Sequence, residues 1–221
     1  MRGMEITVRS EATGRRQPEL STLWATASAE GTDRAAARQQ VTAVMQELVD
    51  SLDELGASRP DAVRSRVVAP LATRTWQPWG DDGKRLDPRH EVTGRVRVQL
   101  ADLEALADLT TAWSARDEVA LQSPTWSLTD DSQRALYAEV TRDAVRQARE
   151  RAQVMAEASG FSMVEPLQVA DTGLLGGGDD QRVGQVQAFR AAGAGAADDG
   201  YDLTPQDVEV RVTVEARFRA E

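Results

Sequence analysis

Alternation of apolar and polar residues predicts two long strands. Residues 208–219 place Val or another apolar side chain at every even position and a charged or polar one between them, and residues 92–100 repeat this pattern. A period of two indicates a strand with one buried and one solvated face. Because antiparallel sheets tolerate a solvated face, we expect both strands in an antiparallel sheet. Weaker strand patterns cover residues 6–11, 20–30, 63–76, 119–128 and 163–170.

Two amphipathic segments predict the first two helices. One follows Gly31, with Thr32 as the expected N-cap, and ends at Gly56 after apolar residues at spacings of one, three and four. The second begins at Asp102, directly after a strand, and repeats leucine at intervals of three up to Trp113. Each helix therefore has one apolar face that can pack on a sheet.

A third helix is predicted over about residues 130–159. Thr129 or Asp130 can cap its start, and Gly160 can close its end. Alanines recur at intervals of four and form a ridge that allows close approach to a neighbouring element; they are Ala144, Ala148, Ala152 and Ala156. The opposite face is rich in arginine, either as a solvated face with weak ion pairs or as a partner-binding stripe.

The predicted order of elements is β-β-α-β-β-α-β-α-β-β. Strands and helices are too mixed along the chain for a doubly wound parallel sheet, so the predicted fold class is α+β, with an antiparallel or mixed sheet and three helices. We expect one domain over residues 1–221, with loop insertions at about 76–90 and 171–204. The second insertion has a length typical of loops that are disordered, functional or ordered only on assembly.

Charge and composition exclude several classes of protein. The chain has 26 Lys and Arg against 36 Asp and Glu, a formal net charge of -10 at pH 7. This balance excludes a generic nucleic-acid-binding surface, which needs excess positive charge. Cysteine is absent and there is a single histidine. Disulfides, thiolate nucleophiles and cysteine-ligated metals are therefore ruled out.

The N-terminal residues predict neither a signal peptide nor a membrane anchor. Charged and polar residues interrupt the opening segment, and no other window approaches the roughly 20 apolar residues of a membrane-spanning helix. We expect a cytoplasmic protein without a membrane span.

No set of residues predicts catalysis, a cofactor or a metal ion. His90 lacks the serine elbow that a catalytic base would need, so a surface position at a strand entrance is expected. Asp81, Asp82 and Asp87 lack the spacing of a calcium loop and fit a turn. The glycines at 176–178 are not followed by Lys-Ser or Lys-Thr, so a flexible loop is expected there instead of a phosphate site.

Tryptophans provide the candidate contact residues. Trp76 and Trp79 lie in the first insertion, either as exposed anchors for a partner or as a lid folded back on the core. With His90, they are the candidate partner or ligand contacts. Trp24, Trp113 and Trp126 lie within predicted elements, and we expect them in the core.

Several segments together resemble a known family. The third helix is preceded by Trp126-Ser127-Leu128-Thr129-Asp130 and carries the alanine ridge up to Gly160. Ile6-Thr7-Val8 with Pro18-Glu19-Leu20-Ser21, the strand over 92–100 with Asp102-Leu103, and Leu203-Thr204-Pro205 with the final strand occur in matching order. This arrangement resembles the SIMPL-domain family, named for a signalling molecule associated with a Pelle-like kinase, whose bacterial relatives include periplasmic immunogenic proteins.

The resemblance implies an α+β fold, assembly into homo-oligomers in some relatives, links to envelope or oxidative stress, and no catalytic residues. Our first hypothesis is a non-enzymatic assembly or protein-interaction module that contacts other copies through edge strands and insertions. The alternative is a small-ligand-binding domain whose pocket lies between sheet and helices, roofed by Trp76 and Trp79.

Overall fold

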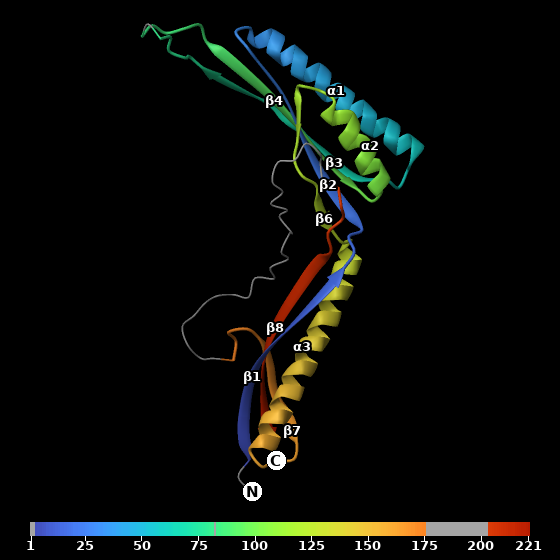
Figure 1. The fold of residues 1–221 in the computed structure, drawn as a ribbon, viewed down its shortest axis with the longest axis vertical. Helices are drawn as coiled ribbons and strands as arrows, with labels where there is room; N and C mark the ends of the chain where they lie inside the picture. The colour runs from blue at the N-terminus through green and yellow to red at the C-terminus, as the bar shows by residue number, and fades with distance from the viewer. Residues whose placement is uncertain (1–2, 82, 176–202) are drawn as a thin grey trace. The chain divides into compact units, whose positions relative to one another are not determined.

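The computed structural model describes residues 3–81, 83–175 and 203–221, which form two compact units (Figure 1). Of these residues, unit 1 comprises 3–17, 128–175 and 206–221, and unit 2 comprises 18–81, 83–127 and 203–205. The predicted α+β class and order of elements are confirmed. The single domain over residues 1–221 stays a prediction, and most of the insertion at 171–204 lies outside the described residues.

Unit 1 is a three-stranded antiparallel sheet covered by one helix. Its strands are β1 (Met4–Arg16), β8 (Val208–Ala220) and β7 (Val164–Asp171), in the order β1-β8-β7. Helix α3 (Asp130–Ala158) packs on the apolar face (Figure 1). The strand pattern predicted at the C-terminus is thus the central strand, with Val210, Val212, Val214, Ala216 and Phe218 buried.

Charge pairs on the solvated face of unit 1 match the pairing of β1 with β8. Arg9 lies opposite Glu215, and Arg15 lies opposite Glu209. Both are ion pairs, with nitrogen–oxygen distances of 2.7 and 2.9 Å. A slip by one residue would break these pairs and turn the buried positions towards solvent, so both faces of the sheet specify the register.

The alanine ridge of α3 allows close packing on the sheet. Ala144, Ala148, Ala152 and Ala156 are fully buried. Of the two residues that could cap the start of α3, Thr129 is the N-cap, and its hydroxyl accepts a hydrogen bond from the Ser132 N–H. At the other end Gly160 has φ +85°, and the N–H groups of residues 160 and 161 donate to the carbonyls of 157 and 156. This is a Schellman motif, which requires the left-handed conformation that glycine adopts without strain.

Unit 2 is a larger antiparallel sheet with two helices on one face. The strands β2 (Leu20–Gly31), β3 (Val63–Trp76), β4 (Arg89–Leu100) and β5 (Val119–Leu121) have the order β3-β4-β2-β5, and β6 (Thr125–Ser127) also pairs with β2. Helices α1 (Arg34–Ser58) and α2 (Leu103–Ser114) cover the apolar face (Figure 1). The strand predicted over 119–128 is two short strands, with Pro124 between them unable to donate to a ladder.

The first helix departs slightly from its predicted ends. Asp33, not Thr32, is the N-cap, and its carboxylate accepts hydrogen bonds from the Ala35 and Ala36 N–H groups. The helix also continues past Gly56 to Ser58. Aspartate and threonine are both favourable N-cap residues, so the sequence alone did not show which of these two adjacent residues caps the helix.

Candidate functional site

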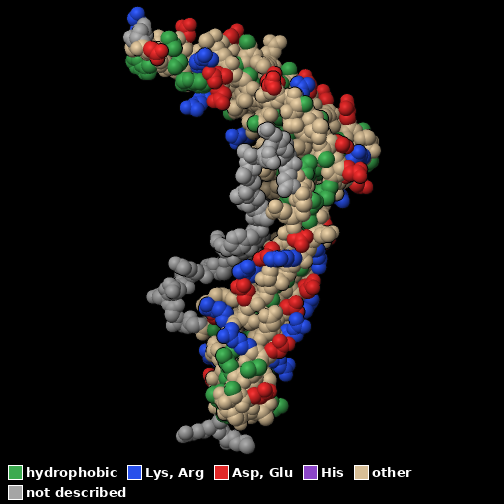
Figure 2. Space-filling model, viewed as in Figure 1, with side chains coloured by type: hydrophobic (Ala, Val, Ile, Leu, Met, Phe, Trp, Pro, Cys, Tyr) green, Lys and Arg blue, Asp and Glu red, His purple; other side chains and the backbone are tan. Residues whose placement is uncertain are grey.

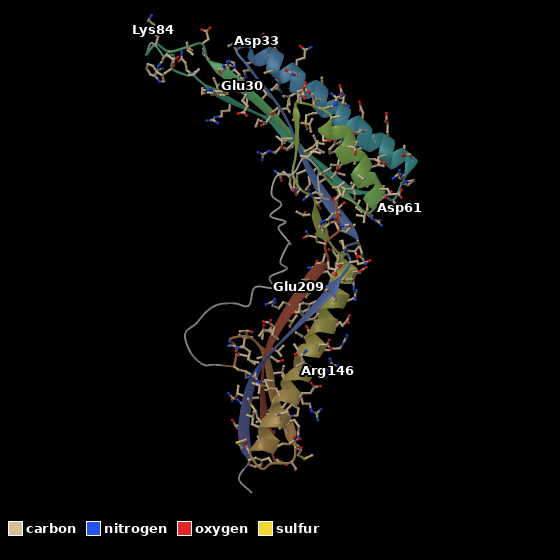
Figure 3. All side chains as sticks on the ribbon, viewed as in Figure 1. Glu30, Asp33, Asp61, Lys84, Arg146 and Glu209 are labelled. Atoms are coloured by element: carbon tan, nitrogen blue, oxygen red, sulfur yellow. The ribbon has the colours of Figure 1, made fainter. Side chains whose placement is uncertain are left out.

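The tip of the β3–β4 hairpin, described at residues 77–81 and 83–88, is a largely exposed turn. Trp79 pairs with Arg85 in an isolated bridge, and the Arg85 guanidinium carbon lies 5.1 Å from the Trp79 ring centroid. The Gly80 N–H donates to the Lys84 carbonyl at 2.8 Å (Figure 3 labels Lys84 at this tip). Trp79 is 65% exposed and Leu86 is 50% exposed. Of the two alternatives for Trp79, the structure therefore shows the exposed side chain and not the lid.

The three candidate contacts lie on one hairpin but do not converge. Thr75 lies opposite His90, and the Thr75 hydroxyl is hydrogen-bonded to His90 Nδ1 at 2.9 Å. Trp76 lies opposite Arg89, one position further along. Successive strand residues project to opposite faces, so Trp76 and His90 are on opposite sides of the sheet. Trp76 therefore does not form the roof expected for a pocket on the helix side.

The sheet face of unit 2 opposite α1 and α2, here called the outer face, combines tryptophan and arginine. Arg97 lies over the Trp24 ring at 5.7 Å, and Arg74 lies over the Trp76 ring at 5.5 Å. Trp24 was predicted in the core, and this was wrong, because its side chain is 38% exposed. The alternation along β2 could have shown that Trp24 faces outward. Ala25 is buried, and Trp24 and Thr26 lie on the opposite, polar face of the strand. Of the other two, Trp113 is buried and Trp126 packs partly buried on the core.

Arg95 is an exposed positive charge on the outer face. It is exposed on the central part of β4, between Thr26 of β2 and Ala69 of β3. Among the described residues no carboxylate forms an ion pair with Arg95 or Arg97. An unpaired guanidinium can donate to a carboxylate or phosphate in a fork geometry, so this face can bind an anion.

The packing between sheet and helices in unit 2 is tight at its centre. A Cβ placed on Gly94 would come within 2.6 Å of the Met45 sulfur and 2.9 Å of a Leu71 methyl carbon. Side chains from α1 and β3 thus meet over a position that has no side chain of its own.

Unit 1 has a shallow, charged hollow of about 500 Å³ between β1, β8 and α3. Its lining includes Arg9 and Arg151, whose guanidinium donates to the Arg9 carbonyl at 3.1 Å. The Arg9 guanidinium lowers the pKa of Glu215, and the N–H groups of Gly173 and Leu175 lower it further, against the opposing effect of burial. Glu215 therefore stays ionised and ties the turn after β7 to β8.

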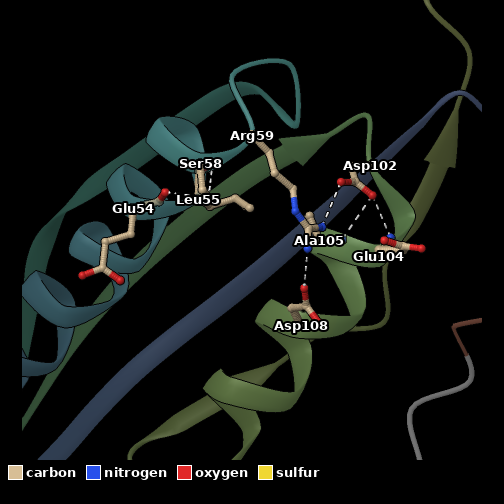
Figure 4. A network of polar contacts seen from close by, with 8 residues as sticks. All are labelled: Glu54, Leu55, Ser58, Arg59, Asp102, Glu104, Ala105 and Asp108. Atoms are coloured by element: carbon tan, nitrogen blue, oxygen red, sulfur yellow. Dashed lines mark hydrogen bonds and ion pairs between the residues drawn. The ribbon is translucent and has the colours of Figure 1, made fainter.

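A second polar cluster joins the two helices of unit 2 (Figure 4). Arg59, at the end of α1, donates to Asp102 at 3.0 Å and to Asp108 at 3.2 Å. Asp102 is also the N-cap of α2, accepting from the Glu104 and Ala105 N–H groups. Burial raises the pKa of Asp102, but the hydrogen bonds from Ala105, Arg59 and Glu104 outweigh it and the pKa is lowered. This cluster therefore holds the end of α1 against the start of α2.

Within the described part of the chain, no three or more His, Asp or Glu side chains gather in a way that could hold a metal ion. Asp81 and Asp87 lie in the hairpin tip, whereas Asp82 and the glycines at 176–178 are outside the described residues. None of the helices described here is long and apolar enough to cross a bilayer.

Comparison with known proteins identifies a family that covers nearly all of the chain. Residues 6–218 match SIMPL, described as a protein of unknown function (DUF541). No curated protein matches the sequence. The matched range includes every helix and most of the strand residues of both units, so the resemblance seen in the sequence is confirmed. The chain belongs to the SIMPL family.

Proposed function

We propose that this protein is a non-enzymatic interaction module that assembles with other copies of itself through the tip of the β3–β4 hairpin. The observation that carries the proposal is the exposure of Trp79 and Leu86 on a turn that contributes to neither core. Exposed large apolar side chains of this kind mark interaction surfaces, and tryptophan is enriched among the residues that dominate binding energy.

Light scattering after size exclusion tests this proposal. The wild-type chain is expected to give a defined mass above that of one chain, and the double variant Trp79→Ser, Leu86→Ser is expected to lower it. Val154→Ser on α3 is the matched control, because Val154 is also 65% exposed but lies in unit 1. A wild-type chain that stays monomeric at high concentration, or a double variant with unchanged mass, would contradict the proposal.

The link to stress and the cytoplasmic location stay predictions of the sequence. The absence of enzymatic activity is likewise a prediction of the sequence.

A further inference from the structure

The edge of the unit 2 sheet is a long strand with an open side. β3 spans 14 residues and ends the sheet order, with β4 on one side and, among the described residues, no strand on the other. Edge strands present backbone N–H and C=O groups that can pair with an added strand. Val67 and Val68 in this strand are 49% and 45% exposed. This edge therefore offers both backbone pairing and apolar contacts.

Positive charge is concentrated on the same hairpin. Residues 63–100 contain eight Lys and Arg against four Asp and Glu, whereas the whole chain has 26 against 36. β3 itself contains Arg64, Arg66 and Arg74 and no acidic residue. Figure 2 shows Lys and Arg side chains (blue) along this hairpin on the side away from the helices. Within an acidic chain, this edge attracts acidic partners.

The cross-strand rows of the outer face define what an added strand would meet. One row consists of Trp24, Arg97 and Val67, and the next consists of Thr26, Arg95 and Ala69. Arg97 is engaged with the Trp24 ring, whereas Arg95 has no ion pair among the described residues. Adjacent strands are about 4.8 Å apart, so an added strand would lie about 10 Å from β4. Arginine and glutamate side chains together span that distance, and the methyl group of Ala69 does not block the path.

We propose that residues 65–69 of β3 bind an extended acidic peptide from a partner protein, which adds a strand to the sheet. An acidic side chain of the peptide lies beside Ala69 and pairs with Arg95, and apolar side chains lie beside Val67 and Val68. This inference rests on the proposed function of the protein as an interaction module and assigns the chemistry of one partner.

Features of β3 disfavour a second copy of the same strand as the occupant. Another β3 would bring three further arginines to the edge, and of these only Arg66 has an ion pair among the described residues, with Asp53 of α1. Pro70 has no N–H, and the pairing with β4 is irregular between Ala69 and Ala72. Such features protect edges from identical strands. They also confine regular pairing to the short stretch that ends at Ala69.

Fluorescence anisotropy on the full-length protein tests the inference. The probe is a fluorescein-labelled peptide with the sequence Thr-Glu-Val-Val-Glu-Thr, and its counterpart has lysine in place of both glutamates. We expect saturable binding of the acidic peptide and no saturable binding of the lysine peptide. A hydrogen bond to a charged group contributes about 1.5–3 kcal/mol, so Arg95→Glu should weaken binding by about tenfold or more. Arg38→Glu is the matched control, because it makes the same charge change on an exposed position of α1.

Strand addition has its own control. An acidic peptide N-methylated at both valines keeps its charge but loses backbone donors, so it should not bind. Equal binding of the N-methylated or the lysine peptide, equal effects of Arg95→Glu and Arg38→Glu, or tighter binding of a labelled oligothymidylate would each overturn the inference.

The two proposals fail separately. A monomeric protein that binds the acidic peptide contradicts self-assembly and supports the edge site. An oligomer that does not bind the peptide contradicts the edge site alone. The hairpin-tip variant Trp79→Ser, Leu86→Ser should keep its affinity for the peptide, and Arg95→Glu should keep the wild-type mass.

Discussion

Gly14 of β1 lies close against side chains of α3, so its replacement by alanine tests the packing of unit 1. A Cβ on Gly14 would lie 2.5 Å from a γ-methyl carbon of Val140 and 3.0 Å from a δ-methyl carbon of Leu136. Carbon atoms in contact normally sit about 3.5–4.0 Å apart, so the overlap with Val140 is about 1 Å. Valine in a helix has one strongly preferred rotamer, and it cannot turn away freely.

We expect Gly14→Ala to lower the free energy of unfolding by about 1 kcal/mol, within bounds of about 0–2.5 kcal/mol. Overpacking costs about 1–3 kcal/mol, and the lower backbone entropy of alanine in a strand offsets about 0.5–1 kcal/mol of it. Adding Val140→Ala should relieve the overlap. The double-mutant cycle should therefore show a favourable coupling of at least about 0.5 kcal/mol.

Hydrogen exchange of α3 peptides, measured by mass spectrometry, reports the change in stability of unit 1. All five tryptophans lie in unit 2, so their fluorescence during urea unfolding reports the other unit separately. Gly56→Ala in α1 is the control with the opposite sign: nothing lies within 4 Å of its added Cβ, and alanine should stabilise the helix by about 0.5–1 kcal/mol. If Gly14→Ala left exchange in α3 unchanged, or if Val140→Ala gave no coupling, the close approach would not constrain the unit.

Two further predictions concern polar groups in unit 2. Ser21 is fully buried, and its hydroxyl has no hydrogen-bond partner among the described residues. Ser21→Ala should therefore raise the free energy of unfolding by about 1 kcal/mol. Urea unfolding followed by tryptophan fluorescence measures this change, and a loss of stability would contradict the prediction. Asp102→Ala should lower stability by about 1 kcal/mol at pH 7, because it removes the cap of α2 and the partner of Arg59. The pKa of Asp102 is lower in the folded protein than the ordinary aspartate value of about 3.9. The ionised carboxylate therefore stabilises the fold at any pH above that ordinary value, and this stabilisation is lost as the pH falls through the lower folded-state pKa. The difference between wild type and Asp102→Ala should thus shrink in acid, and a difference that grows as pH falls would refute the assignment.

The hairpin shows why only part of the candidate site could be predicted. Proline, glycine and two tryptophans between the weaker strand pattern over 63–76 and the clear one over 92–100 indicated an insertion. Trp79 is exposed, which is one of the two alternatives that the sequence left open. The placement of Trp76 and His90 on opposite faces depends on the pairing of β3 with β4. The register of this pairing shifts at two places in β3, and each shift changes which residues of β3 share a face with a given residue of β4. Arg95 was not predicted as a site residue, because a single charged position in a strand looks the same whether or not a carboxylate faces it.

The sequence by itself determined the class of each element and most of its boundaries. Alternation with a period of two identified the strands, and the spacing of apolar residues with caps such as Thr129 identified the helices, because these signals depend on neighbours within a few residues. Only the tertiary structure decided which strands pair. β1 lies beside β8, about 200 residues later, and β4 lies between β2 and β3. Such pairing depends on complementary faces and charges of distant segments, which local periodicity does not encode. The same distance in sequence kept Arg95, Ala69 and Trp24 from being recognised as one surface.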